Sequence, residues 1–180
     1  MRKTIVWLVF VALFAALISA GAFIAIPIGP VPIVLQNLFT LLAGLVLGPL
    51  LGTLAVGLFL VAGAIGLPVF ANASSGLARI LGPSGGYLFG YLLGALVAGL
   101  IMGYPRSGEK IPLLRLVVAV AAGMLVVYIP GLLRLKMFLE IDWARTFNIG
   151  LFPFIIGDSL KGIVAACAAG RLRRIASQFL

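Results

Sequence analysis

The sequence predicts an all-α integral membrane protein, folded as a bundle of six transmembrane helices. Apolar residues make up 63% of the chain and charged residues 9%, whereas soluble domains carry roughly 45 to 50% and about 25%. The apolar residues recur in six runs, divided by Pro, Gly and charged residues, at 4–26, 33–47, 50–66, 85–104, 112–130 and 149–170. Because the gaps are short, we expect a single transmembrane domain over residues 1–180.

Each run is expected to form a helix, because backbone polar groups in lipid must be satisfied within their own segment. A closed barrel would show short alternating strands instead. The first run follows a basic start and has the look of a signal peptide, but it is long enough to span about 30 Å of hydrocarbon. We interpret it as the first span. The second and third runs are short and divided only by Gly48 and Pro49, so a re-entrant pair is the alternative there.

The basic residues predict the orientation. With six spans both termini lie on one side, which collects Arg2, Lys3, Arg106, Lys110, Arg115, Arg171, Arg173 and Arg174. The other side collects only Arg79, Arg134, Lys136 and Arg145. Cytoplasmic loops carry the excess of Lys and Arg, so we predict that both termini are cytoplasmic. The outer connections are then 27–32, 67–84 and 131–147, and the net charge of +9 requires no nucleic-acid partner.

Small residues recur at intervals of four in three runs, where they would let helix backbones approach closely. The first set is Ala12, Ala16 and Ala20, and the others are Gly44, Gly48 and Gly52, and Gly86, Gly90, Gly94 and Ala98. We expect the two glycine ladders to pack helices within the bundle. The alanine stripe lies on a terminal helix, where it serves either packing or the docking of a partner protein.

Asp158 and Lys161 lie in the last apolar run, although the whole chain has only four acidic residues. Three residues apart on a helix, they share one face. Charges within a span are costly and usually face the interior, a cavity or each other. Since the last run enters from outside, the pair falls in the outer half of the membrane. It either neutralises itself and orders the bundle, or forms part of an outward-facing site.

The connection before the fourth run carries a second polar group, with Asn72, Arg79 and the GPSGGY turn at 82–87. Glycines and a small hydroxyl at a helix amino terminus expose N–H groups that suit a carboxylate. A plain turn with an N-cap serine is the alternative. Gln36, within an apolar run, is a further inward-pointing candidate, unless it and Asn37 only bond between helices.

The sequence offers no catalytic constellation. It has no His, and its single cysteine is Cys167, so a His or Cys metal site and an internal disulfide have no ligands. A Ser–His relay and a paired-carboxylate site are likewise unsupported, and the phosphate-binding motif of ATPases is absent. We therefore expect no enzyme, metal or cofactor. Together the polar residues singled out above offer hydrogen-bond donors, acceptors and a cation among apolar side chains, which suits the binding of a small amphipathic solute.

Three stretches together resemble the BioY family: "GPVPIVLQNLFTLLAGLVLGP", "GAIGLPVFANASSGLARILGPSGGYLFGY" and "PFIIGDSLKGIVAACAAGRLRR". The resemblance implies the biotin-specific subunit of an energy-coupling-factor transporter in a prokaryotic cell membrane. Its partners would be a transmembrane coupling protein and two cytoplasmic ATPases. The implied biotin contacts are Gln36, Asn72, Arg79, Ser84, Gly85, Gly86, Tyr87, Asp158 and Lys161, and the implied coupling surface is Ala12, Ala16 and Ala20.

Two orientations of biotin remain open in this interpretation. Asp158 accepts from the ureido N–H groups while the carboxylate lies near Arg79 or the amides of 82–87, or Lys161 holds the carboxylate instead. The alternatives to a biotin subunit are a structural membrane subunit and a subunit for another small carboxylate-bearing vitamin. The connection 131–147 is expected to be an interfacial helix or part of a lid.

Overall fold

The computed structural model describes residues 2–179 and is almost entirely helical. Its elements are α1 (Arg2–Phe23), β1 (Ala25–Ile26), β2 (Ile33–Val34), α2 (Gln36–Ala64), the 3₁₀ turn η1 (Ala71–Ala73), α3 (Leu77–Leu81), α4 (Gly85–Met102), α5 (Leu113–Leu139), α6 (Trp143–Gly150) and α7 (Phe152–Ala176). Within that range five helices, α1, α2, α4, α5 and α7, are long and apolar enough to cross a membrane. The predicted class, a helical multi-pass membrane protein, is confirmed.

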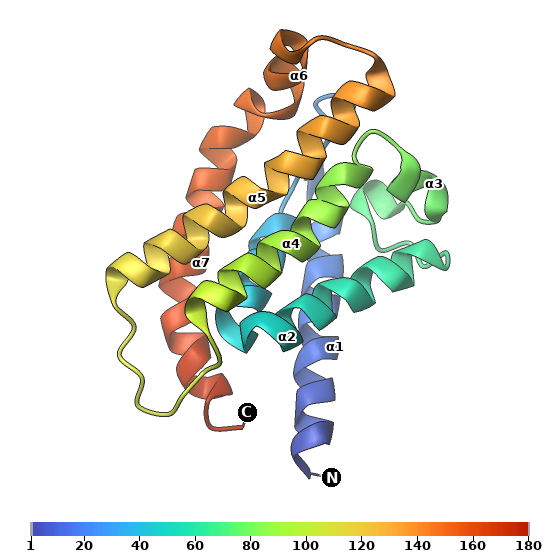
Figure 1. The fold of residues 1–180 in the computed structure, drawn as a ribbon. Helices are drawn as coiled ribbons and strands as arrows, with labels where there is room; N and C mark the ends of the chain where they lie inside the picture. Colours follow the sequence, from blue (N-terminus) through green and yellow to red (C-terminus); the bar gives the residue numbers. More distant parts are fainter. Residues whose placement is uncertain (1, 180) are drawn as a thin grey trace.

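Both ends of the chain lie at one end of the bundle, here called the terminal end (Figure 1). The short helices α3 and α6 lie towards the opposite end, here called the far end. Many large apolar side chains point outward along the long helices, among them Ile156, which is 83% exposed, and Leu125, which is 67% exposed. Such a surface suits contact with lipid rather than water.

Helix α2 contains both the second and the third predicted runs. It bends sharply at Gly48, whose φ of 82° is left-handed, and the next residue is Pro49. Beyond the bend Gly52 lies against an earlier part of the same helix, since a Cβ there would be 2.7 Å from the Ala43 carbonyl oxygen. In a straight helix residues nine apart are separated by about 13.5 Å. The two halves of α2 are therefore folded back against each other, and a count of six spans requires each half to cross.

The glycine ladders bring helices into backbone contact. Gly90 and Gly94 of α4 face Val127 and Gly123 of α5, and a Cβ on Gly94 would lie 2.6 Å from the Gly123 carbonyl oxygen. Gly44 of α2 lies directly against the backbone of Ala95 in α4. The ladders thus hold α2, α4 and α5 together, as expected, and a side chain at these positions would push the helices apart.

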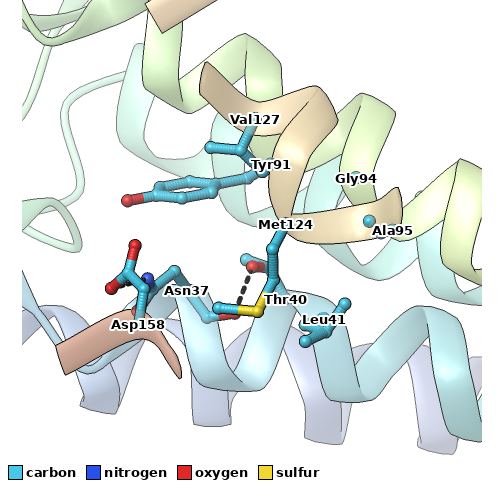
Figure 2. A pocket seen from close by; sticks show the side chains of 10 residues that line it. Asn37, Thr40, Leu41, Tyr91, Gly94, Ala95, Met124, Val127 and Asp158 are labelled. Carbon is cyan, nitrogen blue, oxygen red and sulfur yellow. Dashed lines mark hydrogen bonds between the residues drawn. The ribbon is translucent and has the colours of Figure 1, made fainter. Parts of the chain in front are cut away.

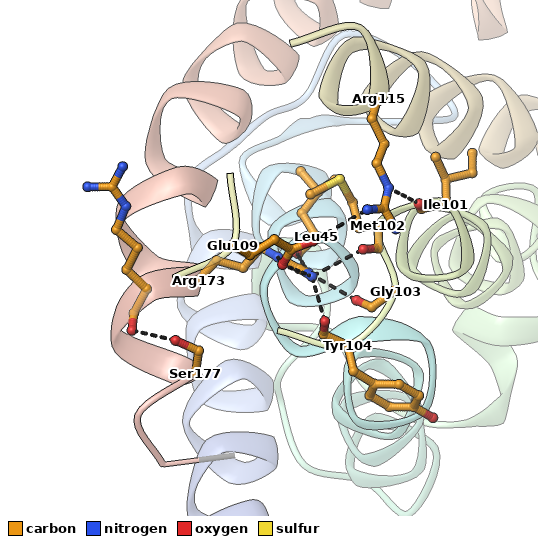
Figure 3. A network of polar contacts seen from close by, with 10 residues as sticks. Leu45, Ile101, Met102, Gly103, Tyr104, Glu109, Arg115, Arg173 and Ser177 are labelled. Carbon is orange, nitrogen blue, oxygen red and sulfur yellow. Dashed lines mark hydrogen bonds and ion pairs between the residues drawn. The ribbon is translucent and has the colours of Figure 1, made fainter. Parts of the chain in front are cut away.

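Arg173 makes the main polar contacts between helices at the terminal end. From the sequence it was counted only among the basic residues on the cytoplasmic side. It is 2% exposed, pairs with Glu109 at 3.0 Å, and donates to the carbonyl oxygens of Leu45, Met102, Gly103 and Tyr104 (Figure 3). These carbonyls belong to the end of the first half of α2 and to the end of α4, where helical partners run out. One guanidinium therefore caps two helix ends.

The far end differs from expectation in the connection 131–147. Helix α5 does not stop at Pro130 but continues to Leu139, and α6 follows after a three-residue turn. Asp142 caps α6 by accepting from the Arg145 backbone N–H at 2.7 Å. The connection is thus mostly helical, which agrees with a helix there but not with the end of the fifth run at Pro130, because a proline within a membrane helix is tolerated where its surroundings satisfy the freed backbone.

Candidate functional site

Asp158 is the hub of a polar network near the far end. Its Oδ1 accepts from Asn37 Nδ2 at 2.8 Å and from Lys161 Nζ at 2.9 Å, and its Oδ2 accepts from the Tyr128 hydroxyl at 2.6 Å. The Asp158 and Lys161 side chains are only 13% and 11% exposed. Asp158 and Lys161, both on α7, neutralise each other, and α2 and α5 add hydrogen bonds to Asp158 through Asn37 and Tyr128. The charges within the span are therefore fully compensated.

Two small cavities border this network, and another lies next to one of them. The first, the inner cavity, is lined by Val31, Pro32, Val34, Asn37, Tyr87, Tyr91, Val127, Tyr128, Phe154, Asp158 and Lys161. The second, the outer cavity, shares Val31, Pro32, Val34, Tyr87 and Tyr91 with it and adds Gln36, Phe70, Ala71, Arg79, Ser84 and Leu88. A third runs from Asp158 and Asn37 towards Thr40, Met124 and Gly94 in the bundle centre (Figure 2). Each has a volume of about 20 Å³.

Polar atoms without partners line these cavities. Three buried side-chain atoms make no hydrogen bond to any residue from 2 to 179: Asn37 Oδ1, Gln36 Nε2 and Ser84 Oγ. A buried unsatisfied group costs about 1 to 3 kcal/mol, and native proteins contain few. An unpaired acceptor therefore borders the inner cavity, while an unpaired donor and a hydroxyl border the outer one.

Tyr87 forms the wall between the two cavities. Its hydroxyl donates to the Gly150 carbonyl oxygen at 2.7 Å, which ties the start of α4 to the end of α6. Its ring lies edge-on to Tyr128, with centroids 6.3 Å apart. Gly131 of α5 permits this position, because a Cβ there would lie 2.5 Å from the ring. Tyr87 is consequently held from two sides, while Tyr91 faces Asn37 and Asp158 across the third cavity (Figure 2).

The predicted site residues divide into three groups in the structure. Asp158, Lys161 and Tyr87 line the inner cavity, and Gln36, Arg79 and Ser84 meet Tyr87 at the outer one. The remaining three, Asn72, Gly85 and Gly86, line neither.

Those three residues have other surroundings. Asn72 is exposed and adopts a left-handed φ of 59° in η1. Gly85 lies against the backbone of Ile80 in α3, and Gly86 lies against that of Pro130 in α5. Both glycines therefore provide close packing, which explains a glycine pair at this turn without a ligand.

The turn itself does not behave as a simple capped helix start. Ser84 is the N-cap residue of α4, but its side chain makes no capping hydrogen bond. Its hydroxyl is buried instead, without a partner in the described part of the chain. The structure therefore disfavours the N-cap interpretation of Ser84 and leaves the hydroxyl available to the outer cavity.

Sequence reasoning did not assign Asn37, Tyr91 or Tyr128 to the site. Asn37 was considered only as a bond between helices, and the two tyrosines lie in apolar runs that read as packing. The sequence feature that could have indicated them is a polar side-chain group, an amide or a hydroxyl, within an otherwise apolar helix. The sequence does not show how the helices are arranged, and Tyr128 meets Asp158 only because α5 packs beside α7.

The stripe formed by Ala12, Ala16 and Ala20 faces outward from α1, as all three residues are exposed. The opposite face of α1 enters the core through Val11, Ala15 and Ile18. Within residues 2–179, moreover, no group of three or more His, Cys, Asp or Glu side chains gathers in a way that would hold a metal ion.

Comparisons with known proteins agree with one another. A model of the BioY family matches residues 1–178. A "Probable biotin transporter BioY" of Pyrococcus horikoshii is 43% identical, over 91% of this chain and 93% of its own length. The "Biotin transporter BioY" of Thermotoga maritima is 40% identical, over 93% and 96%. A crystal structure of "the S-component for biotin from an ECF-type ABC transporter" superposes with a TM-score of 0.84 and 32% identity, over 96% of this chain and 93% of that one.

Proposed function

The chain belongs to the BioY family, and from this premise we propose that it is the biotin-binding membrane subunit of a vitamin uptake transporter. Biotin is its substrate and not a cofactor, and the family consists of transporter components, not enzymes. We infer capture of biotin at the far end and delivery inward with a transmembrane coupling protein and two ATPases. One observation carries the proposal: residues with unpaired buried polar atoms line two cavities that meet at Tyr87 and Tyr91, and one of the cavities includes the Asp158 and Lys161 pair.

Biotin's chemistry matches the two cavities in one orientation. Its ureido ring presents two N–H donors and an accepting carbonyl, and its aliphatic chain ends in a carboxylate. Asn37 Oδ1 is a free acceptor, and Asp158 retains acceptor capacity beyond its three bonds. Lys161 has further N–H donors for the ureido carbonyl. We place the ureido ring in the inner cavity, where each charge-assisted bond contributes roughly 1.5 to 3 kcal/mol.

The carboxylate is then assigned to the outer cavity. Gln36 Nε2 and Ser84 Oγ lack partners there, and Arg79 brings a positive charge to the same wall. In the reverse orientation Lys161 would face two carboxylates, that of Asp158 at 2.9 Å and that of biotin, and one buried negative charge would stay uncompensated. Asn72, Gly85 and Gly86 are left out of the proposed contact set because they line neither cavity.

Biotin entry requires the cavity walls to part. Cavities of about 20 Å³ accommodate little more than one water molecule, whereas ligand pockets measure about 300 to 1,000 Å³. The segment 27–32 is the wall best able to move, because Val31 and Pro32 line both cavities and the segment lies outside any helix, between the two-residue strands β1 and β2. We propose that this segment opens for the ligand and closes over it.

We propose six membrane crossings in one substrate-binding domain, with α2 counted twice. The bend at Gly48 lies beside Gly103 and Tyr104, just past the end of α4, and Gln36 begins α2 beside the far-end cavities. The first half of α2 thus leads from the far-end cavities to the terminal end, and the second half returns to Gly63, which lies against Phe70 in the wall of the outer cavity. Both contacts support two crossings over a re-entrant pair. The charge distribution supports cytoplasmic termini, even with Arg173 removed from the count as a buried residue.

A titration of the purified chain with biotin tests this function. We expect binding by the chain alone at micromolar or lower biotin, and at least tenfold weaker binding by Asp158→Ala and Lys161→Ala, which each leave the partner unpaired. Arg145→Ala, an exposed change at the far end, is the matched control. The absence of any binding heat would favour a structural subunit, and equal binding of nicotinate or pantothenate would favour another vitamin.

A further inference from the structure

A larger groove lies outside the candidate site, between α3, α4 and α5 at the far end. Its volume is about 370 Å³, and it is lined by Ile80, Leu81, Gly85, Gly86, Phe89, Pro130, Leu133, Arg134 and Met137. Leu81, Phe89 and Met137 are 61%, 53% and 71% exposed, so the groove opens outward. Gly85 and Gly86 also line it, where they pack against the backbone of Ile80 and Pro130. Apart from Arg134 the walls are apolar.

The depth of Arg134 can be judged from α5 itself. Arg115 and Arg134 lie nineteen residues apart on this helix, a separation of about 29 Å at 1.5 Å per residue. The hydrocarbon core of a bilayer is about 30 Å thick. The separation of the two arginines along α5 is thus close to the thickness of the hydrocarbon, which supports a position of Arg134 near the lipid headgroups, with the apolar groove beside it.

The charge of Arg134 is not neutralised by the protein. Its Nε and Nη2 donate to the carbonyl oxygens of Gly82 and Leu81, and its guanidinium lies 5.6 Å from the centroid of the Phe138 ring. Among residues 2–179 the three ion pairs involve other cations, and Nη1 makes no hydrogen bond. Arg134 thus offers a free donor and a full positive charge beside an apolar groove.

We propose that this groove binds a phospholipid with an anionic headgroup. The acyl chain lies along Phe89, Pro130 and Leu133, on the hydrocarbon side of Arg134, and the phosphate accepts from Arg134. Apolar walls and an uncompensated cation at headgroup depth complement an amphiphile that carries a phosphodiester. Arg134 also holds the end of α3 through Leu81 and Gly82. A lipid on Arg134 therefore braces the segment that carries Arg79 and Ser84, and so stabilises the outer cavity.

Lipid titration of the detergent-purified chain tests this site, with thermal unfolding and native mass spectrometry as readouts. Phosphatidylglycerol should raise the Tm by several degrees and remain bound, whereas phosphatidylcholine should do so at least tenfold less effectively. Arg134→Gln should abolish the difference between the two lipids, and Leu133→Trp, which fills the groove without touching the charge, should weaken both. Lys136→Gln, on the same helix but directed at Trp143, is the matched control and should respond like the wild type.

The comparison between lipids keeps the test independent of how stable each variant is. Equal responses to the two lipids in the wild-type chain would overturn the proposal, as would a full phosphatidylglycerol response in Arg134→Gln. Glycerol 3-phosphate supplies the headgroup without an acyl chain, and we expect it to have no effect. A matching shift with glycerol 3-phosphate would show a free-anion site and would equally overturn the lipid assignment.

Discussion

Gln36 and Ser84 illustrate how a membrane-embedded site can be recognised from single residues. Both are almost completely buried, at 1% and 6% exposed, and each has a side-chain atom without a hydrogen-bond partner in the described chain. Asp158, by contrast, accepts three hydrogen bonds. A polar group that serves only packing is expected to be satisfied within the bundle. The unsatisfied pair is therefore the stronger sign of a ligand, and the satisfied Asp158 is the anchor around which it is arranged.

A change at Gln36 should separate stability from binding. Gln36→Leu removes an unsatisfied buried amide, so we expect it to stabilise the ligand-free protein by about 1 to 3 kcal/mol while weakening biotin binding at least tenfold. Thermal unfolding with and without biotin measures both effects. Asn148→Leu, an exposed substitution of the same kind on α6, should change neither. A Gln36→Leu protein that binds biotin normally would remove Gln36 from the site.

At the scale of elements, the helix ends explain how the bundle is closed. The first half of α2 stops at Gly48 and α4 stops at Met102, and both leave carbonyl groups to Arg173 at the terminal end. A cation at a helix carboxyl terminus also complements the helix dipole. At the far end Tyr87 joins α4 to α6 in a comparable way. Polar contacts therefore join α2 and α4 to α7 at the terminal end and α4 to α6 at the far end. Glycine contacts hold α2, α4 and α5 together between these ends.

Removing the tie at Arg173 should cost more than the loss of an ordinary surface charge. Arg173→Gln leaves several buried carbonyls without donors and breaks a pair that is 2% and 17% exposed. We expect a loss of about 3 to 5 kcal/mol in the free energy of unfolding, measured by denaturant titration in detergent. Arg174→Gln, the exposed neighbour, should stay within about 0.5 kcal/mol. A wild-type unfolding curve for Arg173→Gln would contradict the capping role.

Local patterns predicted the elements that depend on short spacings. Asp158 and Lys161 form the expected pair because residues three apart on a helix always share a face, and the glycine ladders meet helix backbones as their spacing indicated. The partners of Asp158 were not predictable in the same way, since Asn37 and Tyr128 come from helices that are distant in sequence. The end of α5 was predicted wrongly at Pro130, because a proline ends a helix only where its surroundings cannot satisfy the backbone groups that it leaves unpaired.

For the whole molecule, we propose that biotin binding and coupling to transport use different surfaces. The cavities lie inside the bundle near the far end, whereas Ala12, Ala16 and Ala20 form a smooth exposed stripe on α1. The chain carries no phosphate-binding motif for ATP, and the proposed transport relies on partner ATPases. We infer that the alanine stripe is where the coupling protein packs, because small residues allow close helix contact in lipid.

A bulky residue on the stripe should separate the two activities. Ala16→Trp is expected to leave biotin binding unchanged and to abolish biotin uptake in vesicles that contain the coupling protein and ATPases. Ala121→Trp adds the same bulk to an exposed position on α5 and should leave uptake intact. Normal uptake with Ala16→Trp would remove the stripe from the coupling surface, and loss of binding would show that the change disturbs the bundle.

The central claim is that the inner cavity holds the ureido ring and the outer cavity holds the carboxylate. Its most direct test is a calorimetric comparison of biotin with its uncharged methyl ester. The wild-type chain should prefer biotin by at least tenfold, or about 1.4 kcal/mol, and Arg79→Gln should remove most of that preference. Lys161→Ala should weaken the binding of both ligands but leave the preference for biotin over its methyl ester unchanged. A preference that survives Arg79→Gln but disappears in Lys161→Ala would contradict this orientation and place the carboxylate at Lys161.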